Sequence, residues 1–453
     1  MSSGSLLSAE APLHEHPAQG GLPRLLAGIP ADGPMTLYTH LAVHGPLPAE
    51  SRRRRRAESP LIGRVERAGL RGRGGAGFPT ALKLRAVAGA RRRAVMVVNA
   101  AEGEPASRKD RTLCEVLPHL VLDGAQLAAR AVGAGEVIVC TCESALGGGE
   151  GIAAAIEERA GTSGGEIAMS VVPAPAGYVS GQETALVNYL NGGAAVPTFT
   201  PPAPYQQGVR RRPTLINNAE TCAHIALIAR HGSQWFRQLG MPSQPGSALV
   251  TLSGPVASPG VYEIEHGASL RSLLDAAGGT TAPVRAMLIG GYGGSWIGEE
   301  LLRGVALSQE HLAPHGASLG AGVLLLLSAE ACPVAETARA ARWMARESSR
   351  QCGPCLNGLD AIAASIEQIA GAGPESGATR RLELLLGLVR RRGACAHPDG
   401  AANLVASALE TFAPEFADHA RHGTCEACMR PSELPLPAHP PDRPAARRSR
   451  WAS

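Results

Sequence analysis

The 453-residue sequence contains few aromatic residues, almost no lysine and no long apolar run. Without an apolar run near the length of a membrane-spanning helix, the chain is not expected to cross a membrane directly. The formal net charge of +4 is small for this length, and the arginine runs at 52–56 and 91–93 lack interleaved aromatics. Nucleic-acid binding is therefore not indicated.

The N-terminus shows no charged segment followed by an apolar core, so no export signal is apparent. Ten cysteines are too few for a disulfide scaffold in a chain of this size, and they cluster toward the C-terminus. This distribution favours metal ligands in a reducing compartment. We therefore expect a cytoplasmic protein.

Lysine occurs only twice, as Lys83 and Lys109, while every other strongly basic residue is arginine. Lysine is a compact point charge with rotatable donors, which the planar guanidinium of arginine does not replace. Lys83 follows a glycine-rich loop, and Lys109 follows the polar loop at 99–105, which comes after a predicted strand. Both loops are candidate ligand-binding loops. This placement indicates that both lysines contribute to a binding site.

The first of these loops is rich in glycine and lies at residues 69–79. Gly72, Gly74, Gly75 and Gly77 permit left-handed backbone, and successive N–H groups in such a bend can hold an anion. Thr80 is expected to begin a helix whose positive end faces the same spot. A phosphate-bearing cofactor is the natural ligand, and a plain glycine-rich loop is the alternative.

The loop formally matches the dinucleotide fingerprint G-x-G-x-x-G, but its context differs. That fingerprint follows a strand, whereas the spacing of Ile62, Val65 and Leu70 predicts a helix over 61–70. No acidic residue stands about twenty positions further on, where a ribose partner is expected. An ordinary dinucleotide-binding turn is therefore disfavoured.

Periodicity divides the chain into five parts. An α/β part with a mainly parallel sheet is predicted from strands at 94–98, 136–142 and 166–172 and helices at 80–89, 118–131 and 149–159. A small α+β module follows, with strands at 248–253, 260–264, 286–289 and 322–327 and a lone helix at 269–277. Four helices are expected at 334–348, 358–369, 379–392 and 401–412. The predicted boundaries are an irregular or loosely attached arm (1–55), the α/β domain (56–240), the α+β module (245–330), the helical domain (331–420) and a Pro- and Arg-rich tail (421–453). This tail is expected to be mobile apart from Cys425 and Cys428.

The cysteines near the C-terminus permit several kinds of site. Cys352 and Cys355 form a C-x-x-C pair, and Cys395 lies forty residues on, so redox dithiol, zinc and iron–sulfur sites all fit. An iron–sulfur cluster normally takes four thiolates. Ser349 stands three residues before Cys352, so that S-x-x-C-x-x-C would offer a serine oxygen as a fourth ligand. Cys425 and Cys428 could instead join Cys352 and Cys355 around zinc. The remaining cysteines, which lie in apolar contexts and are expected in the core, are Cys114, Cys140, Cys142, Cys222 and Cys332.

Five motifs, in this order along the chain, carry a resemblance to a known family. They are the glycine loop at 69–83, the Asn-Ala-Ala-Glu-Gly-Glu-Pro run at 99–105, Gly-Gln-Glu-Thr at 181–184, Asn-Asn-x-Glu-Thr at 217–221, and the run at 347–355 that ends in Cys-Gly-Pro-Cys. The sequence resembles the NADH-binding flavoprotein subunit of NADH:quinone oxidoreductase, respiratory complex I. Related subunits occur in NAD-linked hydrogenases and formate dehydrogenases.

The resemblance implies a fold, two cofactors and a substrate. The fold is an α/β FMN-binding domain with a Rossmann-like sheet, followed by a β-grasp α+β module and a helical iron–sulfur bundle. The cofactors are FMN and one 4Fe–4S cluster, and the substrate is NADH. Hydride passes to the flavin and single electrons pass to the cluster and then to partner redox subunits, so the redox chemistry belongs to the cofactors.

The resemblance also assigns site residues. Those expected to bind the flavin are Gly72, Gly74, Gly75, Lys83, Asn99, Glu102, Gly103, Tyr178, Gly181, Asn217 and Asn218. Those expected near the nicotinamide nucleotide are Phe78 and the two candidate catalytic carboxylates, Glu104 and Glu183. Those expected to hold the cluster are Cys352, Cys355 and Cys395, with Ser349 at the position of the family's first cysteine.

The sequence departs from the family pattern at several of these positions. Ala101 replaces an aspartate, Gln182 replaces a glutamate, and Ala86 stands where the family has an aromatic residue. Thr200–Ala203 replaces a Lys-Pro-Pro-Phe segment, which removes a cation and a stacking ring from the dinucleotide site. Two alternatives therefore accompany the NADH prediction: a flavoprotein with another donor such as ferredoxin, and a non-catalytic zinc or interaction scaffold.

Overall fold

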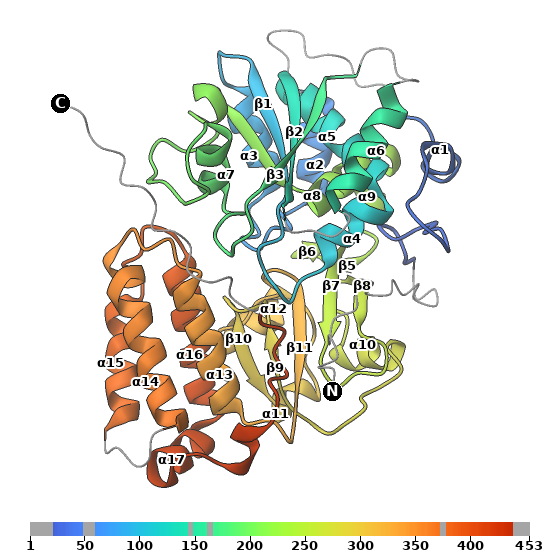
Figure 1. The fold of residues 1–453 in the computed structure, drawn as a ribbon. Coiled ribbons are helices and arrows are strands. Elements are labelled where there is room, and N and C mark those ends of the chain that lie inside the picture. The colour runs from blue at the N-terminus through green and yellow to red at the C-terminus, as the bar shows by residue number, and fades with distance from the viewer. Residues whose placement is uncertain (1–20, 49–58, 144–147, 161–165, 372–376, 438–453) are drawn as a thin grey trace, which may run out of the picture.

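A computed structural model describes residues 21–48, 59–143, 148–160, 166–371 and 377–437 (Figure 1). Three regions follow one another along the chain: an α/β region, a smaller region around a mixed sheet, and a bundle of helices. Among the described residues, no helix is both long and apolar enough to cross a bilayer.

The α/β region is built on a four-stranded sheet with the order β3-β2-β1-β4, in which every pairing is parallel. Its strands are β1 (Ala94–Ala100), β2 (Ala134–Cys142), β3 (Met169–Ala174) and β4 (Thr214–Asn218). The predicted parallel sheet is thus confirmed. The near-continuous apolar run of β1 follows from its place inside the sheet, where both of its faces are covered.

The two faces of this sheet are covered differently. Met96 and Val98 of β1 pack in one core with apolar residues of four helices, α2 (Pro60–Ala68), α3 (Thr80–Ala88), α5 (Pro118–Val132) and α8 (Ala219–His231). Val95 and Val97 pack on the opposite face with Leu186 of α7 (Glu183–Leu190). Also in this region are α4 (Lys109–Val116), α6 (Gly148–Ala160), α9 (Ser233–Phe236) and the 3-10 turn η1 (Val209–Arg211).

Local sequence explains where α2, the helix before the glycine loop, begins and ends. The Ser59 hydroxyl caps α2 by accepting from the Leu61 N–H at 3.3 Å, and Pro60 occupies the first turn, where its missing N–H costs nothing. Gly69 ends α2 in the left-handed conformation. The predicted helix before the glycine loop is confirmed. Lys109 begins α4, a helix that the sequence analysis did not predict.

The second region contains a five-stranded sheet with the order β10-β9-β11-β7-β8. The strands are β7 (Ser247–Ser253), β8 (Gly260–Glu265), β9 (Val284–Ile289), β10 (Ser295–Gly298) and β11 (Val323–Ser328). β11 is fully buried, pairs parallel with β7 and antiparallel with β9, and confirms the strand predicted from its apolar run. A short hairpin, β5 (Gly240–Met241) with β6 (Gln244–Pro245), precedes the sheet.

Helix α10 (Leu270–Ala276) of this region was predicted, but it is not alone. The short helices α11 (Glu299–Leu302) and α12 (Gln309–Leu312) and the 3-10 turn η2 (Ala313–His315) accompany it. Strand β10 was also missed by the sequence analysis. These elements are only three or four residues long, too short for a periodic pattern to emerge.

The helical region packs α13 (Pro333–Arg346), α14 (Leu359–Gly371), α15 (Ala378–Val389), α16 (His397–Thr411) and α17 (Ala413–His422) around one core. The π-turn η3 (Pro354–Gly358) precedes α14, and the 3-10 turn η4 (Glu426–Met429) follows α17. Four of these helices were predicted. The fifth, α17, follows α16 directly at Phe412, which is buried at the junction.

Within the described residues, the N-terminal part has no helix or strand over 21–36, as predicted, but a helix follows and the segment is docked on the rest of the chain. Residues 21–48 include α1 (Leu37–His44), and the N–H groups of Arg24, Leu25 and Leu26 all donate to one carboxylate oxygen of Glu263, at 2.8, 2.9 and 3.2 Å. Both leucine side chains are buried. The prediction missed this docking because its anchor lies more than two hundred residues away in the sequence. Residues 49–58 lie outside the described residues.

The C-terminal tail is likewise ordered over part of its length. Residues 423–437, which we call the C-terminal strap, run from α17 across β9 and β11 (red in Figure 1). Glu433 accepts hydrogen bonds from the N–H and hydroxyl of Ser328, at the end of β11. Leu434 is buried in the helical core. The expectation of mobility, which exempted Cys425 and Cys428, is therefore wrong for the part of this segment around Glu433 and Leu434. Residues 438–453 lie outside the described residues.

Candidate flavin and iron–sulfur site

The glycine loop joins α2 to α3 as a tight bend. The Gly72 N–H donates to the Phe78 carbonyl at 2.9 Å, and a bridge between Arg71 and Pro79 closes the base of the loop. Gly75 and Gly77 have φ of +103° and +60°, a backbone region that favours glycine. Gly75 and Gly77 therefore serve the bend itself, and only Gly77 belongs to the dinucleotide fingerprint.

Arg73, in the same loop, points inward and is buried. Its guanidinium donates to the Ser247 carbonyl at 2.8 Å and lies 3.6 Å from Glu220, while its N–H donates to the Thr221 hydroxyl at 2.9 Å. These bonds tie the glycine loop to both α8 and β7. Arg73 was not singled out by the sequence analysis, because the inward turn of one arginine among many has no sequence signal.

Lys109 lies in a buried group of charges beside Arg73. Its ammonium is 2.8 Å from Asp110 and 3.0 Å from Glu220. Although burial disfavours the carboxylate, Lys109 and then His224 and Arg73 hold the pKa of Glu220 at about 2. Burial also opposes the Lys109 ammonium, yet Asp110 and Glu220 raise its pKa. Two cations and two carboxylates leave this group formally neutral, so a bound phosphate would depend on N–H and amide donors.

Lys83 lies on α3, where its ammonium pairs with Glu183 at the start of α7 and donates to the Ile216 carbonyl at 3.0 Å. This bond spans two elements on different faces of the parallel sheet. The structure therefore brings together one predicted flavin residue and one predicted catalytic carboxylate, a pairing that the sequence analysis did not foresee.

A cavity of about 360 Å³ lies where the three regions meet. Its volume falls within the roughly 300–1,000 Å³ typical of cofactor sites. The predicted site residues that line it are Gly74, Asn99, Glu102, Gly103, Glu104, Tyr178, Gly181 and Asn218. Gly293 and Ala321 complete the wall from the mixed-sheet region, and Cys395, His397 and Gly400 from the helical region.

The other predicted residues lie around this cavity without lining it. Gly72 and Gly75 line a neighbouring cavity of about 770 Å³, together with Lys109 and Glu220. Phe78 is half exposed on the surface, and Asn217 is buried on β4. The sequence motifs thus converge on one part of the molecule, although not every residue faces the same space.

Two glycines in the cavity wall allow backbones to cross closely. A Cβ atom at Gly103 would lie 2.7 Å from the Tyr178 carbonyl oxygen, and one at Gly181 would lie 2.5 Å from the Ala101 carbonyl oxygen. Both distances are too short for a side chain, and the obstructing atoms are backbone. Only glycine permits the 99–105 and 177–184 loops to meet here, which explains the two glycines at these positions.

Three asparagines hold the rim or remain available to a ligand. Asn99 donates to the Gly181 carbonyl at 2.7 Å, and Asn218 caps α8 while its amide donates to Asp110 at 2.6 Å. The amide nitrogen of Asn217 is buried and has no hydrogen-bond partner among the described residues. A buried unpaired donor is costly, and beside a cofactor cavity it fits a polar group of a ligand.

Glu102 and Glu104 both belong to the loop at 99–105. Glu104 accepts from the Tyr292 N–H at 2.8 Å and the Ala106 N–H at 3.3 Å. Burial, with a contribution from Glu102, raises the pKa of Glu104 to about 8. Burial and Asp110 also raise the pKa of Glu102, which accepts from the Ser107 hydroxyl and two backbone N–H groups. Glu104 is therefore a carboxyl group poised to hold a proton near neutral pH.

The predicted cluster ligands lie at the edge of this cavity. Cys352 and Cys355 flank the start of η3, and Cys395 precedes α16 and lines the cavity itself. Burial raises the pKa of the Cys355 thiol to about 12, and the neighbouring Cys352 and Cys395 thiols add to this rise. The three thiols therefore lie close enough to affect one another's ionisation. Ser349 stands three residues before Cys352, in the turn that follows α13.

His397, which the sequence analysis did not single out, lies between the cavity and the thiols. Its Nε2 donates to the Met344 carbonyl at 2.9 Å, and its ring centroid lies 5.3 Å from that of Tyr178. Its buried Nδ1 has no partner within the part of the chain that the structure describes. The signal that could have identified it is its spacing of two residues from Cys395.

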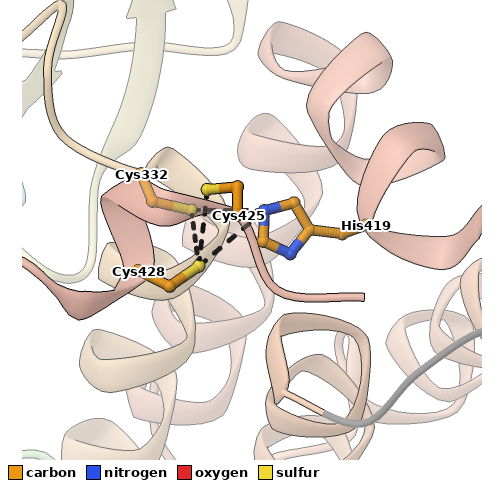
Figure 2. Close-up of side chains that lie close together, drawn as sticks. All are labelled: Cys332, His419, Cys425 and Cys428. Carbon is orange, nitrogen blue, oxygen red and sulfur yellow. Dashed lines mark hydrogen bonds between the residues drawn. The ribbon is translucent and has the colours of Figure 1, made fainter. Parts of the chain in front are cut away.

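Cys425 and Cys428 do not join Cys352 and Cys355 as one interpretation of the sequence proposed. They lie instead with Cys332 and His419 (Figure 2). Cys332 is buried, as expected for a core cysteine, but its thiol is part of this group. No sequence pattern indicated the grouping, because Cys332 and His419 are each isolated in the sequence and belong to no Cys or His motif.

The departures from the family pattern have visible structural roles or surroundings. The Gln182 side-chain oxygen accepts from the Thr184 and Ala185 N–H groups at 2.8 and 3.1 Å, so it caps α7 as a carboxylate would. Phe199 and Tyr205 flank the Thr200–Ala203 segment, and both rings are exposed. Two exposed aromatic rings therefore flank the segment that lacks the family's stacking ring.

Three family descriptions match the sequence in chain order. The match to "Nuo51 FMN-binding domain" covers residues 65–227, that to "SLBB domain" covers 249–294, and that to "NADH-ubiquinone oxidoreductase-F iron-sulfur binding region" covers 335–419. The cavity described above is lined by residues of all three matched segments.

Curated relatives match most of the chain. A NADH-quinone oxidoreductase F subunit of Rhizobium meliloti is 33% identical over 378 residues, covering 81% of this chain and 90% of the relative. The corresponding protein of Mycobacterium tuberculosis (strain H37Rv) is 34% identical, covering 83% and 87%. Among solved structures, the NAD⁺-reducing [NiFe]-hydrogenase in its H₂-reduced state superposes with a TM-score of 0.73 at 30% identity, covering 81% of this chain and 63% of the hydrogenase chain.

Proposed function

We infer the roles of individual residues from the premise that this chain belongs to the family of NADH-quinone oxidoreductase F subunits. The chain is an oxidoreductase of the NADH dehydrogenase flavoprotein type that uses FMN and a 4Fe–4S cluster. FMN, when bound, accepts a hydride and releases electrons singly. The protein's own residues must then bind, orient and shield these groups.

We propose that FMN occupies the cavity lined by Gly74, Asn99, Gly103, Tyr178 and Gly181. The observation that carries this proposal is the crossing of two backbone loops at glycines that no side chain could replace. These glycines let the 99–105 and 177–184 loops approach closely enough to form one wall of the cavity. Glu102 belongs to the same wall.

The phosphate end of the flavin is proposed to lie toward the glycine loop and α8. Asn217 supplies a buried, unpaired amide donor, and Asn218 lines the cavity at the N-terminus of α8. N–H groups at a helix N-terminus favour an anion. Gly72 and Gly75 shape the bend, and Lys83 fixes Glu183 across the sheet.

Glu104, Glu183 and Phe78 are proposed to contact NADH. Phe78 presents a half-exposed ring, which suits stacking on a base. Glu104 lines the cavity and has a pKa of about 8, so it is suited to share a hydrogen bond with a neutral amide. Glu183 is partly exposed and is held in place by Lys83.

We propose that Cys352, Cys355 and Cys395 ligate the cluster, with Ser349 as the fourth ligand. The three thiols lie near one another, and Cys395 lines the flavin cavity. A cluster held there would adjoin the flavin, which is the arrangement that electron transfer between them requires. Serine oxygen is a less ready ligand for iron than thiolate, so the cluster is expected to be more labile than one with four thiolates.

Several finer features complete the proposal. The parallel sheet is proposed to be Rossmann-like and the mixed-sheet region to be a β-grasp module. The protein is proposed to act in the cytoplasm with partner redox subunits that accept its electrons. This inference is supported by the relatives' designation as subunits of an oxidoreductase.

The experiment that tests this function is cofactor analysis of protein purified without oxygen. Wild-type protein should contain one FMN per chain and iron equivalent to one 4Fe–4S cluster. Cys395→Ser should lose the iron and retain FMN, whereas the control Cys142→Ser should retain both. Zinc without flavin or iron would contradict the proposal and support a scaffold. Flavin that is reduced by ferredoxin and not by NADH would identify another donor.

A further inference from the structure

Four potential metal ligands, two of them from the start of the C-terminal strap, converge outside the flavin and iron–sulfur site (Figure 2). The Cys332 thiol lies 3.4 Å from Nε2 of His419 and 3.4 Å from the Cys428 thiol. The Cys425 and Cys428 thiols are 3.6 Å apart, and the Cys428 thiol is 3.9 Å from Nε2 of His419. All four ligand atoms lie within 4.8 Å of one another.

These spacings fit a single metal ion. Ligands around tetrahedral zinc, at about 2.3 Å for sulfur and about 2.0 Å for nitrogen, stand about 3.8 Å apart between two sulfurs and about 3.6 Å apart between sulfur and nitrogen. The four distances given above, 3.4–3.9 Å, lie close to these values, and the other two pairs of ligand atoms are within 4.8 Å. In a four-iron cluster each ligand binds a different iron, so the thiolates would stand much farther apart.

The ligand set also fits zinc chemically. Three thiolates and one imidazole form a common structural zinc set, and all four positions are then filled by protein. A closed set of this kind leaves no position for water or substrate, so the site is suited to hold structure rather than to catalyse a reaction.

The local fold brings the four ligands together from three places. Cys332 caps α13, where its thiol accepts from the Ala335 N–H at 3.4 Å. His419 comes from α17, and both His419 and Cys332 are buried. Cys425 immediately precedes η4 and Cys428 lies within it, where the Cys428 N–H donates to the Cys425 carbonyl at 3.1 Å. The tight turn directs both thiols of the C-x-x-C pair to one side.

From this geometry we propose that Cys332, His419, Cys425 and Cys428 bind one structural Zn²⁺ ion, separate from the 4Fe–4S cluster. Cys332, Cys425 and Cys428 lie outside the segment matched by the iron–sulfur family description, which ends at residue 419. The assignment does not depend on the flavin or on NADH.

The proposed ion fastens the C-terminal strap to the helical bundle and the mixed sheet. Beyond η4, Glu336 of α13 accepts from the Ser432 hydroxyl at 2.7 Å and from the Glu433 N–H at 3.2 Å. The strap then borders a cavity of about 980 Å³ whose opposite wall includes Glu102 and Glu104. Zinc at the start of the strap thus supports one wall of a cavity that adjoins the flavin loop.

The test compares zinc and iron contents of full-length variants purified without oxygen and without chelators. Wild-type protein should hold one zinc per chain. Cys428→Ser should lose its zinc and keep its iron, and Cys352→Ser should lose iron and keep zinc. Loss of iron from Cys428→Ser with zinc unchanged, or wild-type protein without zinc, would overturn the assignment.

A second measurement stands even if Cys428→Ser does not fold. Zinc-edge X-ray absorption of the wild-type protein should show three sulfur ligands at about 2.3 Å and one nitrogen at about 2.0 Å. A first shell made of oxygen and nitrogen alone would contradict the site. Where Cys428→Ser folds, its amide exchange over 423–437 should be faster than that of the wild-type protein. Equal exchange would refute the role of zinc in fastening the strap.

Discussion

Cys395 and Asn99 line the same cavity, although Cys395 lies in the helical region and Asn99 is near the end of β1 in the α/β region. One residue is a proposed cluster ligand and the other a proposed flavin contact. Their shared cavity makes the two cofactors neighbours in our account. It also means that the cavity depends on the packing of separate regions, so changes in one region should be felt in the other.

Gly181→Ala is predicted to weaken FMN binding. The new Cβ would lie 2.5 Å from the Ala101 carbonyl oxygen, so one loop must move and the cavity wall with it. We expect the FMN dissociation constant to rise by at least about tenfold, which corresponds to ~1.4 kcal/mol. Fluorescence of released FMN measures this. Gly304→Ala, where a Cβ meets no atom within 4 Å, is the control. Equal FMN affinity in both variants would contradict the placement.

Ser349→Cys is predicted to strengthen the cluster. A thiolate in the fourth position would replace the weaker serine ligand, since clusters are normally held by four thiolates. The expected result is a slower loss of iron in air, which the visible absorbance of the cluster monitors. Ser348→Cys, which adds a thiol one position earlier at a buried serine, should change nothing. If both variants lose iron at the wild-type rate, Ser349 is not the fourth ligand.

Glu104 is predicted to make stability depend on pH. Its pKa of about 8 in the folded protein lies above the ordinary value of 4.5, so the folded state holds a proton that the unfolded state releases. The contribution is complete below pH 4.5 and is lost as the pH rises through 8. Between these limits the Tm of wild-type protein should fall by several degrees more than that of Glu104→Gln. Parallel Tm profiles for the two proteins would show that Glu104 does not carry a raised pKa.

Glu183→Gln is predicted to raise the KM for NADH without loss of FMN. A hydrogen bond to a charged group contributes about 1.5–3 kcal/mol, so an increase of about tenfold or more is expected. Glu66→Gln is a matched control, because Glu66 pairs with Arg85 on the same helix that carries Lys83. Steady-state kinetics with an artificial acceptor separates the two variants. An unchanged KM in Glu183→Gln would remove Glu183 from the NADH site.

The sequence was informative where function depends on short motifs. The helix before the glycine loop, three of the four parallel strands and the polar loop after β1 were predicted, because apolar periodicity and turn residues act locally. Strand β4 was missed. The motif order also led to the correct family. Even so, the glycine spacing could not distinguish Gly103 and Gly181, which face the opposing backbone, from glycines that only allow a bend.

The missed features are those that depend on distant partners. The inward turn of Arg73 is set by Ser247 and Glu220, and the docking of the N-terminal part is set by Glu263. The Cys332 and His419 group is likewise assembled by helix packing, with only its C-x-x-C pair visible in the sequence. No local pattern encodes such contacts, so they required the three-dimensional structure.

Anaerobic titration with NADH tests the central claim most directly. The wild-type protein, purified with FMN and iron, should lose its flavin absorbance as NADH is added, and a paramagnetic signal of the reduced cluster should appear in the same titration. In Cys395→Ser the flavin should still bleach, but the cluster signal should be absent. A flavin that stays oxidised with excess NADH, while dithionite reduces it, would contradict the account.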